Sequence, residues 1–199
     1  MNNDDFVELI RIGLTHEEQV KYNINKADYN KSIGKMLNEA RNRAKQTKCY
    51  VCKKEISSFC NSHSVPQFCL KTIATDGKVF MSGIQKSIPY LGEDTGVKSV
   101  GTFQIICREC DNTIFQEYEN PLLYNKEPTE QILAQIAKKN YLQMIFKRNL
   151  KHELYSILEN NFSPKIDATV LHEINAIDLD EYIERYNRAR IAARGHHND

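Results

Sequence analysis

The sequence lacks any long hydrophobic run, which removes the usual signals for export and membrane insertion. No stretch of the 199 residues approaches the roughly 18 apolar residues that a membrane-spanning helix needs. The acidic start of the chain is not followed by an apolar run of signal-peptide length. We therefore expect a cytoplasmic protein that does not contact a membrane. Thiols stay reduced in that compartment, so the six cysteines favour metal binding over disulfides.

The sequence also lacks an excess of charge of either sign. Its formal net charge is only +1, which argues against a surface that is basic all over and coats nucleic acid. Apolar residues make up 41% and charged residues 27%, as in an ordinary folded globular protein. A chain of this length can form one domain with a substantial core, or a small zinc domain beside a helical one.

Several catalytic motifs are absent. There is no Gly-x4-Gly-Lys-Ser/Thr phosphate loop, no Gly-x-Ser-x-Gly nucleophile elbow and no His-Glu-x-x-His zinc helix. The sequence therefore gives no support to the enzyme classes that depend on these motifs. It contains no internal repeat or low-complexity tract either.

Two Cys-x-x-Cys pairs stand out among what is present. Cys49, Cys52, Cys107 and Cys110 predict four thiolates around one Zn²⁺, because a two-residue spacer lets both sulfurs of a pair face the same ion. One alternative is a local site made by Cys49, Cys52, Cys60 and His63. Another is a set of buried free thiols. Cys69 is expected to be a small core residue.

A second pattern lies between and after these pairs. Ser62, His63 and Pro66 form a Ser-His-x-x-Pro segment, and Asp111 and Asn112 follow the last cysteine. The combination resembles the HNH (ββα-metal) endonucleases, in the subgroup that builds the motif on a treble-clef zinc site. This resemblance implies an α+β fold with a zinc-bound treble-clef ββα-metal core, which we assign to residues 48–125.

The resemblance also implies roles for individual residues. His63 matches the general base, and imidazole can accept a proton from water at neutral pH. Asp111 and Asn112 match ligands of the catalytic divalent ion, and Glu119 matches a recurrent glutamate with an offset that is one residue longer than usual. Many of these enzymes have Asp or His where this chain has Ser62. In that family an Asn-Leu pair usually precedes the second Cys-x-x-Cys pair. This chain has the segment 101–103 in its place.

The implied activity is metal-dependent hydrolysis of phosphodiester bonds in DNA, with structural Zn²⁺ and catalytic Mg²⁺ or Mn²⁺. Stand-alone proteins that resemble this one serve in restriction or antiphage defence, some with an ATPase partner, and a homo-oligomer is compatible with the sequence. The alternative is a non-catalytic zinc module that binds DNA or a protein partner. The two differ in whether His63 and Asp111 face a common open cleft.

The segment before the first cysteine pair, residues 1–47, is expected to be helical. Apolar residues recur at three- and four-residue steps over residues 28–46, which predicts an amphipathic helix. Its opposite face is basic and could bind phosphates, with a solvated helix face as the plain alternative. The residues that we expect to contact nucleic acid are Arg41, Arg43, Lys45 and Lys48.

Short β-strands are expected inside the nuclease-like segment. We predict strands at residues 56–60 and 103–106, and a hairpin around Asp76-Gly77. The glycine-containing stretch 82–101 is expected to be a loop. Asp111 is expected to be the N-cap of a helix that runs to about Tyr118.

The C-terminal region, residues 126–199, is expected to consist of helices. Pro128 suits the first turn of one helix, which has an apolar stripe that includes Leu133. Asp178 is expected to begin another helix that ends at Gly195.

Overall fold

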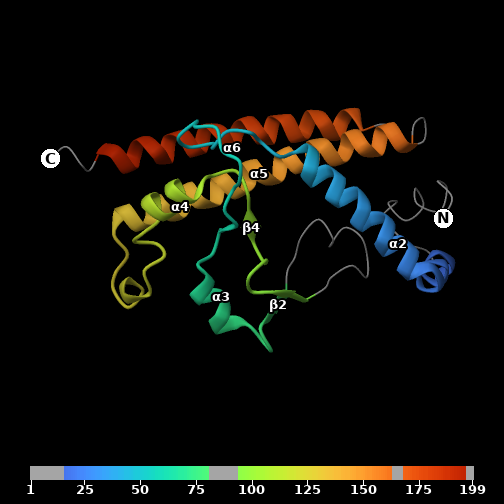
Figure 1. Ribbon diagram of the computed structural model, residues 1–199, viewed down its shortest axis with the longest axis horizontal. Coiled ribbons are helices and arrows are strands. Elements are labelled where there is room, and N and C mark those ends of the chain that lie inside the picture. Colours follow the sequence, from blue (N-terminus) through green and yellow to red (C-terminus); the bar gives the residue numbers. More distant parts are fainter. Residues whose placement is uncertain (1–15, 81–93, 163–167, 196–199) are drawn as a thin grey trace.

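The computed structural model describes residues 16–80, 94–162 and 168–195 and consists mainly of helices (Figure 1). Two long helices, α5 and α6, lie side by side, and α2 and β4 also contact α5, whereas α3 and β2 lie farther from it. Within these ranges, no helix combines the length and the apolar character that crossing a membrane requires. In chain order, the elements are α2 (His16–Arg43), β1 (Ser62–His63), α3 (Gln67–Ile73), β2 (Lys78–Phe80), β3 (Asp94–Gly96), β4 (Thr102–Phe103), α4 (Arg108–Ile114), the 3-10 helix η2 (Pro121–Leu123), α5 (Glu130–Phe162) and α6 (Thr169–Gly195).

The C-terminal region is helical as predicted, but the helix starts differ. Helix α5 begins at Glu130, and Thr129 caps it by accepting a hydrogen bond of 3.2 Å from the Ile132 backbone N–H. Pro128 therefore precedes the first turn. Helix α6 begins at Thr169, so Asp178 lies in its interior, where its carboxylate forms a 2.8 Å ion pair with Arg148 of α5.

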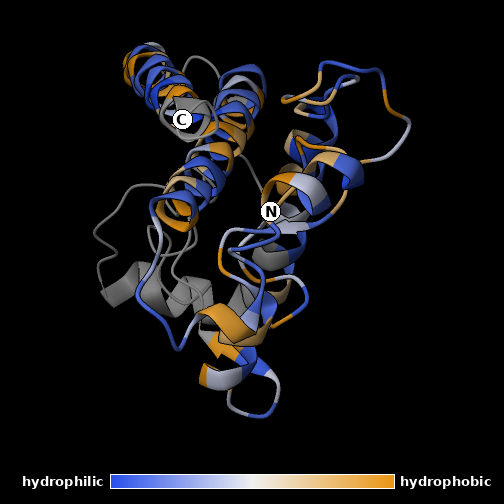
Figure 2. Cartoon of the chain, turned by 90° about the vertical axis from the view of Figure 1, so that its left-hand side faces the viewer, coloured by the Kyte–Doolittle hydropathy of each residue, from blue (hydrophilic) through white to orange (hydrophobic). Residues whose placement is uncertain are grey.

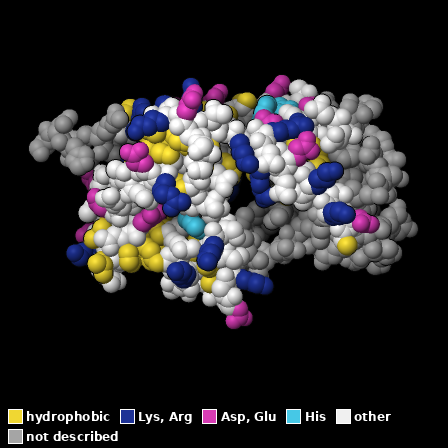
Figure 3. Space-filling view, viewed as in Figure 1, with side chains coloured by type: hydrophobic (Ala, Val, Ile, Leu, Met, Phe, Trp, Pro, Cys, Tyr) yellow, Lys and Arg dark blue, Asp and Glu magenta, His cyan; other side chains and the backbone are white. Residues whose placement is uncertain are grey.

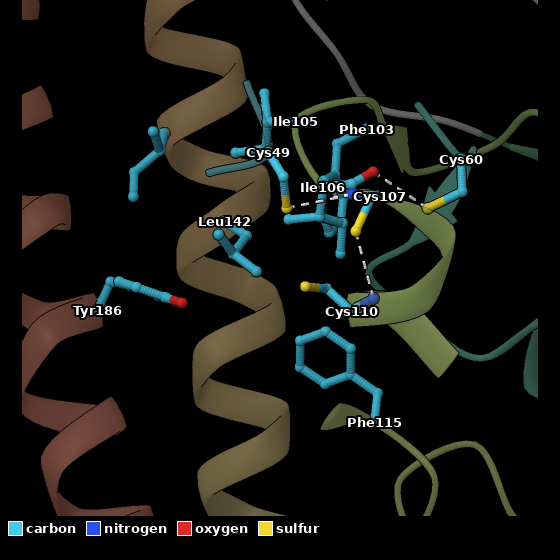
Figure 4. Packing of buried hydrophobic residues seen from close by; sticks show 11 residues of the cluster. Cys49, Cys60, Phe103, Ile105, Ile106, Cys107, Cys110, Phe115, Leu142 and Tyr186 are labelled. Carbon is cyan, nitrogen blue, oxygen red and sulfur yellow. Dashed lines mark hydrogen bonds between the residues drawn. The ribbon is translucent and has the colours of Figure 1, made fainter. Parts of the chain in front are cut away.

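The main core joins the cysteine-bearing segment to both long helices (Figure 4). Leu142 and Ile145 from α5 and Tyr186 from α6 pack in one cluster with the buried cysteines. The cluster is apolar and contiguous, so its burial is a major stabilising contribution. Its remaining members are Cys49, Cys60, Phe103, Ile105, Ile106, Cys107, Cys110 and Phe115. Residues on both sides of the expected boundary at 125/126 share this core, and the division into domains stays a prediction.

The β-structure is smaller than predicted and pairs differently. Strand β1 pairs antiparallel with β4, with Ser62 opposite Phe103 and His63 opposite Thr102. Residues 56–60 form no strand, and β4 covers only the start of the strand expected at 103–106. Apolar residues such as Ile56, Ile105 and Ile106 suit burial as well as strand pairing, so the composition of these segments did not determine which residues form strands.

The turn at Asp76-Gly77 is present, as predicted, but its flanks are not two matched strands. Asp76 and Gly77 have φ of 51° and 71°, the left-handed conformation that short hairpin turns require. Residues 71–73, on the N-terminal side of the turn, belong to α3, which follows Pro66. Strand β2 pairs with β3, which lies inside the stretch expected to be a loop; the rest of that expectation, at residues 81–93, lies outside the described residues.

Helix α4 begins one turn earlier than expected. Its N-cap is Cys107, whose sulfur accepts a hydrogen bond of 3.4 Å from the Cys110 backbone N–H. Asp111 therefore lies within the helix instead of at its N-cap, and the helix ends at Ile114 before reaching Tyr118. A cysteine sulfur can fill the acceptor role that Ser or Asp usually fills, so the expectation for Asp111 was wrong.

Helix α2 begins at His16, before the helix predicted for residues 28–46, and ends at Arg43, within that segment. It contacts α5. In the cartoon coloured by hydropathy, hydrophilic and hydrophobic stretches alternate along the helices, as amphipathic packing requires (Figure 2). Leu133 departs from its predicted place in the apolar stripe of α5, since 52% of its surface is exposed.

Candidate functional site

Four cysteines from the two predicted pairs converge in the structure. The sulfurs of Cys49, Cys52, Cys107 and Cys110 all lie within 4.8 Å of one another. Figure 4 labels three of these cysteines, whose side chains point toward a common region beside α5. The cluster could hold a metal ion, as the sequence predicted.

Backbone N–H groups surround these sulfurs. Cys107 N–H donates to Cys49 Sγ at 3.3 Å. Burial of the Cys49 thiol opposes ionisation, but hydrogen bonds from the backbone of Cys52, Cys107 and Val51 outweigh it and lower its pKa to about 7. Burial and the neighbouring cysteines instead raise the pKa of Cys110. Because thiolates repel one another, full ionisation of the cluster needs a cation at its centre.

The alternative local site is not formed. Cys60 Sγ donates to the carbonyl of Ile106 at 3.4 Å, and burial followed by the nearby Asp111 raises its pKa to about 12. Among the described residues, the only group of three or more potential ligands is the four-cysteine cluster, which includes neither Cys60 nor His63. Cys69 is half-buried.

An open pocket of about 260 Å³ is lined by three of the residues that were assigned to the catalytic site. His63, Asp111 and Glu119 line the same pocket although they come from three different segments. The other lining residues are Asn61, Pro66, Gln67 and Phe68.

His63 is held in this pocket by its strand and by one side-chain hydrogen bond. It is the last residue of β1, and the next residue, Ser64, donates its N–H to Gly101 at 3.1 Å. His63 Nε2 lies 3.1 Å from the carbonyl oxygen of Val97. A carbonyl can only accept, so Nε2 carries the hydrogen and, in the neutral ring, Nδ1 keeps the lone pair.

Asp111 and Glu119 converge on one buried cation, Lys139 of α5. Ser62 donates to Asp111 Oδ1 at 2.6 Å, and Lys139 Nζ lies 3.3 Å from the same oxygen. Lys139 Nζ also pairs with Glu119 Oε1, and it stands 4.6 Å from the centre of the Phe115 ring. The two carboxylates can therefore bind a cation together.

Lys139 was not predicted from the sequence to belong to the site, although the spacing of polar residues in α5 indicated it. Three buried polar residues at four-residue spacing, Gln135, Lys139 and Gln143, face the cysteine-bearing segment. Gln135 accepts from the Tyr118 backbone N–H at 2.9 Å, and Gln143 donates to the Gly101 carbonyl at 3.1 Å. The row shares the apolar face of Ile132 and Leu142, and polar residues on such a face indicate specific partners.

Asn112 is not brought to this pocket. It is exposed and is not among the lining residues, because consecutive residues of a helix point about 100° apart. Its assignment as a ligand has no geometric support.

The basic residues before the first cysteine pair are exposed and contact neighbours along the chain. Arg41 donates to Asn38 at 3.1 Å, Arg43 pairs with Glu39 at 2.6 Å, and Lys45 donates to Asn42 at 2.8 Å. Lys48 lies 3.9 Å from Glu55. On the face shown in Figure 3, Lys and Arg side chains are spread among acidic ones. These residues are accessible to a polyanion, and their role in binding stays a prediction.

Comparisons of the chain with protein-family models, with curated proteins and with solved structures find no match. The chemistry of the site must therefore be argued from its own residues. An imidazole and two carboxylates share an open pocket, beside a cluster that could hold a metal ion.

Proposed function

We infer that this chain is a metal-dependent endonuclease of the HNH type that hydrolyses phosphodiester bonds in DNA. The observation that carries the inference is that His63 and Asp111 line one open pocket, together with Glu119. This juxtaposition is the feature that separates the catalytic hypothesis from the binding-module hypothesis. It joins residues that are about fifty positions apart in the sequence.

The four-cysteine cluster suits Zn²⁺ as a structural ion. Zn²⁺ prefers four thiolates in tetrahedral arrangement, and a closed site of four cysteines leaves no position for a substrate. Its role would be to hold the start of α4 beside residues 49–52, as in a treble clef. A structural zinc can contribute on the order of 10 kcal/mol to folding, which suits a segment with little regular β-structure.

His63 is the candidate general base. With Nε2 engaged by the Val97 carbonyl, the lone pair on Nδ1 can accept a proton from a water molecule. The resulting hydroxide oxygen forms a bond to phosphorus as the bond from phosphorus to the leaving oxygen breaks. Solvent returns a proton to that leaving oxygen, and His63 releases its own proton to solvent.

Asp111 and Glu119 are the candidate ligands of a divalent ion. Carboxylate oxygens suit Mg²⁺ and Mn²⁺, and these two already meet at one ammonium group, so the donor set fits a cation. A divalent ion bound there would polarise the phosphate and stabilise the leaving alkoxide. Ser62 orients Asp111 by donating to Oδ1.

Cleavage of supercoiled plasmid in Mg²⁺ or Mn²⁺ tests this function. The unmodified protein should nick or linearise the plasmid, whereas His63→Ala should be nearly inactive. His152→Ala is the matched control, because His152 is an exposed histidine of α5 that does not line the pocket. Equal cleavage by His63→Ala and unmodified protein would contradict the proposal.

A non-catalytic zinc module is the second candidate, and one observation favours it. Lys139 already pairs with both pocket carboxylates, as in a buried ion pair that serves only to hold the fold. A module of this kind would bind DNA or a protein and cleave nothing under any metal. An ATPase partner and a role in defence against phage are compatible with either candidate and stay predictions.

A further inference from the structure

Lys139 is an unusual residue because its ammonium group is fully buried. Its side chain is 0% exposed, while Asp111 and Glu119, which it contacts, are 14% and 39% exposed. A buried ammonium is costly unless it is paired and hydrogen-bonded. The two carboxylates supply that pairing, and each of them also lines the open pocket. Lys139 therefore approaches the pocket from the core side while solvent reaches its partners from the other side.

We propose that Lys139 is a resident cation that competes with the divalent ion for Asp111 and Glu119 and thereby sets the metal affinity of the pocket. This inference rests on the metal site of the proposed function. The two carboxylates alone carry two negative charges, and Lys139 reduces their combined charge to one. A second cation brought to these carboxylates is repelled by the ammonium and must share their oxygens with it.

The surroundings of Lys139 fix it in this position. It extends from α5, where Gln135 and Gln143, one turn to either side, bond to the backbone of Tyr118 and Gly101. The ring of Phe115 lies 4.6 Å from Nζ and contributes a cation–π contact. The ammonium is thus held against both carboxylates by the docking of the helix, and it cannot swing into solvent.

Lys139 acts on the metal through its partners, so it is a positioning residue, and direct binding of Mn²⁺ is the appropriate readout. Free Mn²⁺ can be measured by electron paramagnetic resonance during titration, with no DNA present. Lys139→Met removes the charge and keeps an unbranched side chain of similar length. We expect it to bind Mn²⁺ at least tenfold more tightly than the unmodified protein, and Lys139→Gln to show the same direction.

Lys147→Met is the matched control, because it removes a lysine charge from the same helix at a residue that does not line the pocket. Its Mn²⁺ affinity should equal that of the unmodified protein. Glu119→Gln should weaken Mn²⁺ binding, and Lys139→Gln combined with Glu119→Gln should return it toward the unmodified value, because the pocket regains its original charge. Unchanged or weaker binding by a folded Lys139→Gln would overturn the proposal.

A measurement on the unmodified protein keeps the proposal testable if the Lys139 variants do not fold. The side-chain ammonium ¹⁵N resonance of Lys139, assigned through bonds to its own carbons, should shift during titration with Mg²⁺. No shift at saturating Mg²⁺ would overturn the competition. A protein that cleaves no DNA but binds Mn²⁺ more tightly as Lys139→Met keeps this inference and loses the nuclease hypothesis. A protein that cleaves DNA with unchanged Mn²⁺ affinity in that variant does the reverse.

Discussion

Ser62 donates a hydrogen bond of 2.6 Å to Asp111 across 49 residues of sequence. Ser62 is 1% exposed, and it lies on β1 immediately before His63. One short strand therefore carries both the candidate base and the group that orients the candidate metal ligand. Ser62 thus orients the Asp111 carboxylate through its hydroxyl group.

Replacing Ser62 by alanine should loosen Asp111. Hydrogen bonds to charged groups contribute about 1.5–3 kcal/mol, so Ser62→Ala should lower the free energy of unfolding by an amount of that order. Chemical denaturation at equal zinc content measures the change. Ser58→Ala, at an exposed position between the first cysteine pair and β1, should leave the stability within error. Equal stability of the two variants would show that the bond to Asp111 has no net effect.

Removal of any cysteine of the cluster should release the structural metal. Cys49→Ser and Cys110→Ser each remove one of four ligands, so the purified variants should contain little zinc and unfold at lower temperature. Elemental analysis and thermal melting check both effects. Cys69→Ser should retain zinc, and so should Cys60→Ser, because neither sulfur belongs to the cluster. Zinc loss in Cys60→Ser with full zinc in Cys107→Ser would instead support the local Cys-x2-His site.

His63 and Asp111 should be separable by metal titration. Loss of a general base typically slows a reaction about 10²–10⁴-fold, so His63→Ala should cleave very slowly yet bind Mn²⁺ normally. Asp111→Asn keeps an acceptor for Ser62 but loses its charge, and it should need more Mn²⁺ to reach half-maximal cleavage. Rates measured across an Mn²⁺ series distinguish the two effects. Identical metal requirements in Asp111→Asn and unmodified protein would remove Asp111 from the metal site.

DNA binding is expected on the end of α2 and the turn after it. Changing Arg41, Arg43 and Lys45 to Glu should weaken binding to duplex DNA and reduce the dependence of the affinity on salt, because fewer counterions are released. Fluorescence anisotropy over a series of salt concentrations measures both quantities. Unchanged affinity would direct attention to the C-terminal arginines Arg185, Arg188 and Arg190. Of these, Arg185 and Arg188 pair with Glu181 and Glu184.

A chain that ends at residue 125 should not fold, even with zinc. It would lack Leu142 and Ile145, which pack against the buried cysteines, and the buried polar row of α5. The apolar cluster would lose its helical partners, and the Asp111 carboxylate would lose the Lys139 ammonium. Circular dichroism and zinc content of this shortened chain provide the test. A folded, zinc-bound product would show that the cysteine-bearing segment folds without α5 and α6.

Features that depend on residues close together in the chain could be predicted from the sequence. A Cys-x-x-Cys pair brings its own sulfurs together whatever surrounds it, so two pairs were enough to predict the four-cysteine cluster. The turn at Asp76-Gly77 was predictable for the same reason, because these two residues favour positive φ. The helical character of residues 130–162 followed from its periodicity.

Contacts between distant segments decided the rest. The two-residue strands β1 and β4 pair with each other, and a strand this short is stabilised only by its partner. The N-cap of α4 is Cys107 and not the predicted Asp111, because the helix begins within the second cysteine pair. The sequence of α5 places Lys139 on the same face as apolar residues but does not identify its partners. Its burial depends on where α5 docks, and only the tertiary structure brings it to Asp111 and Glu119.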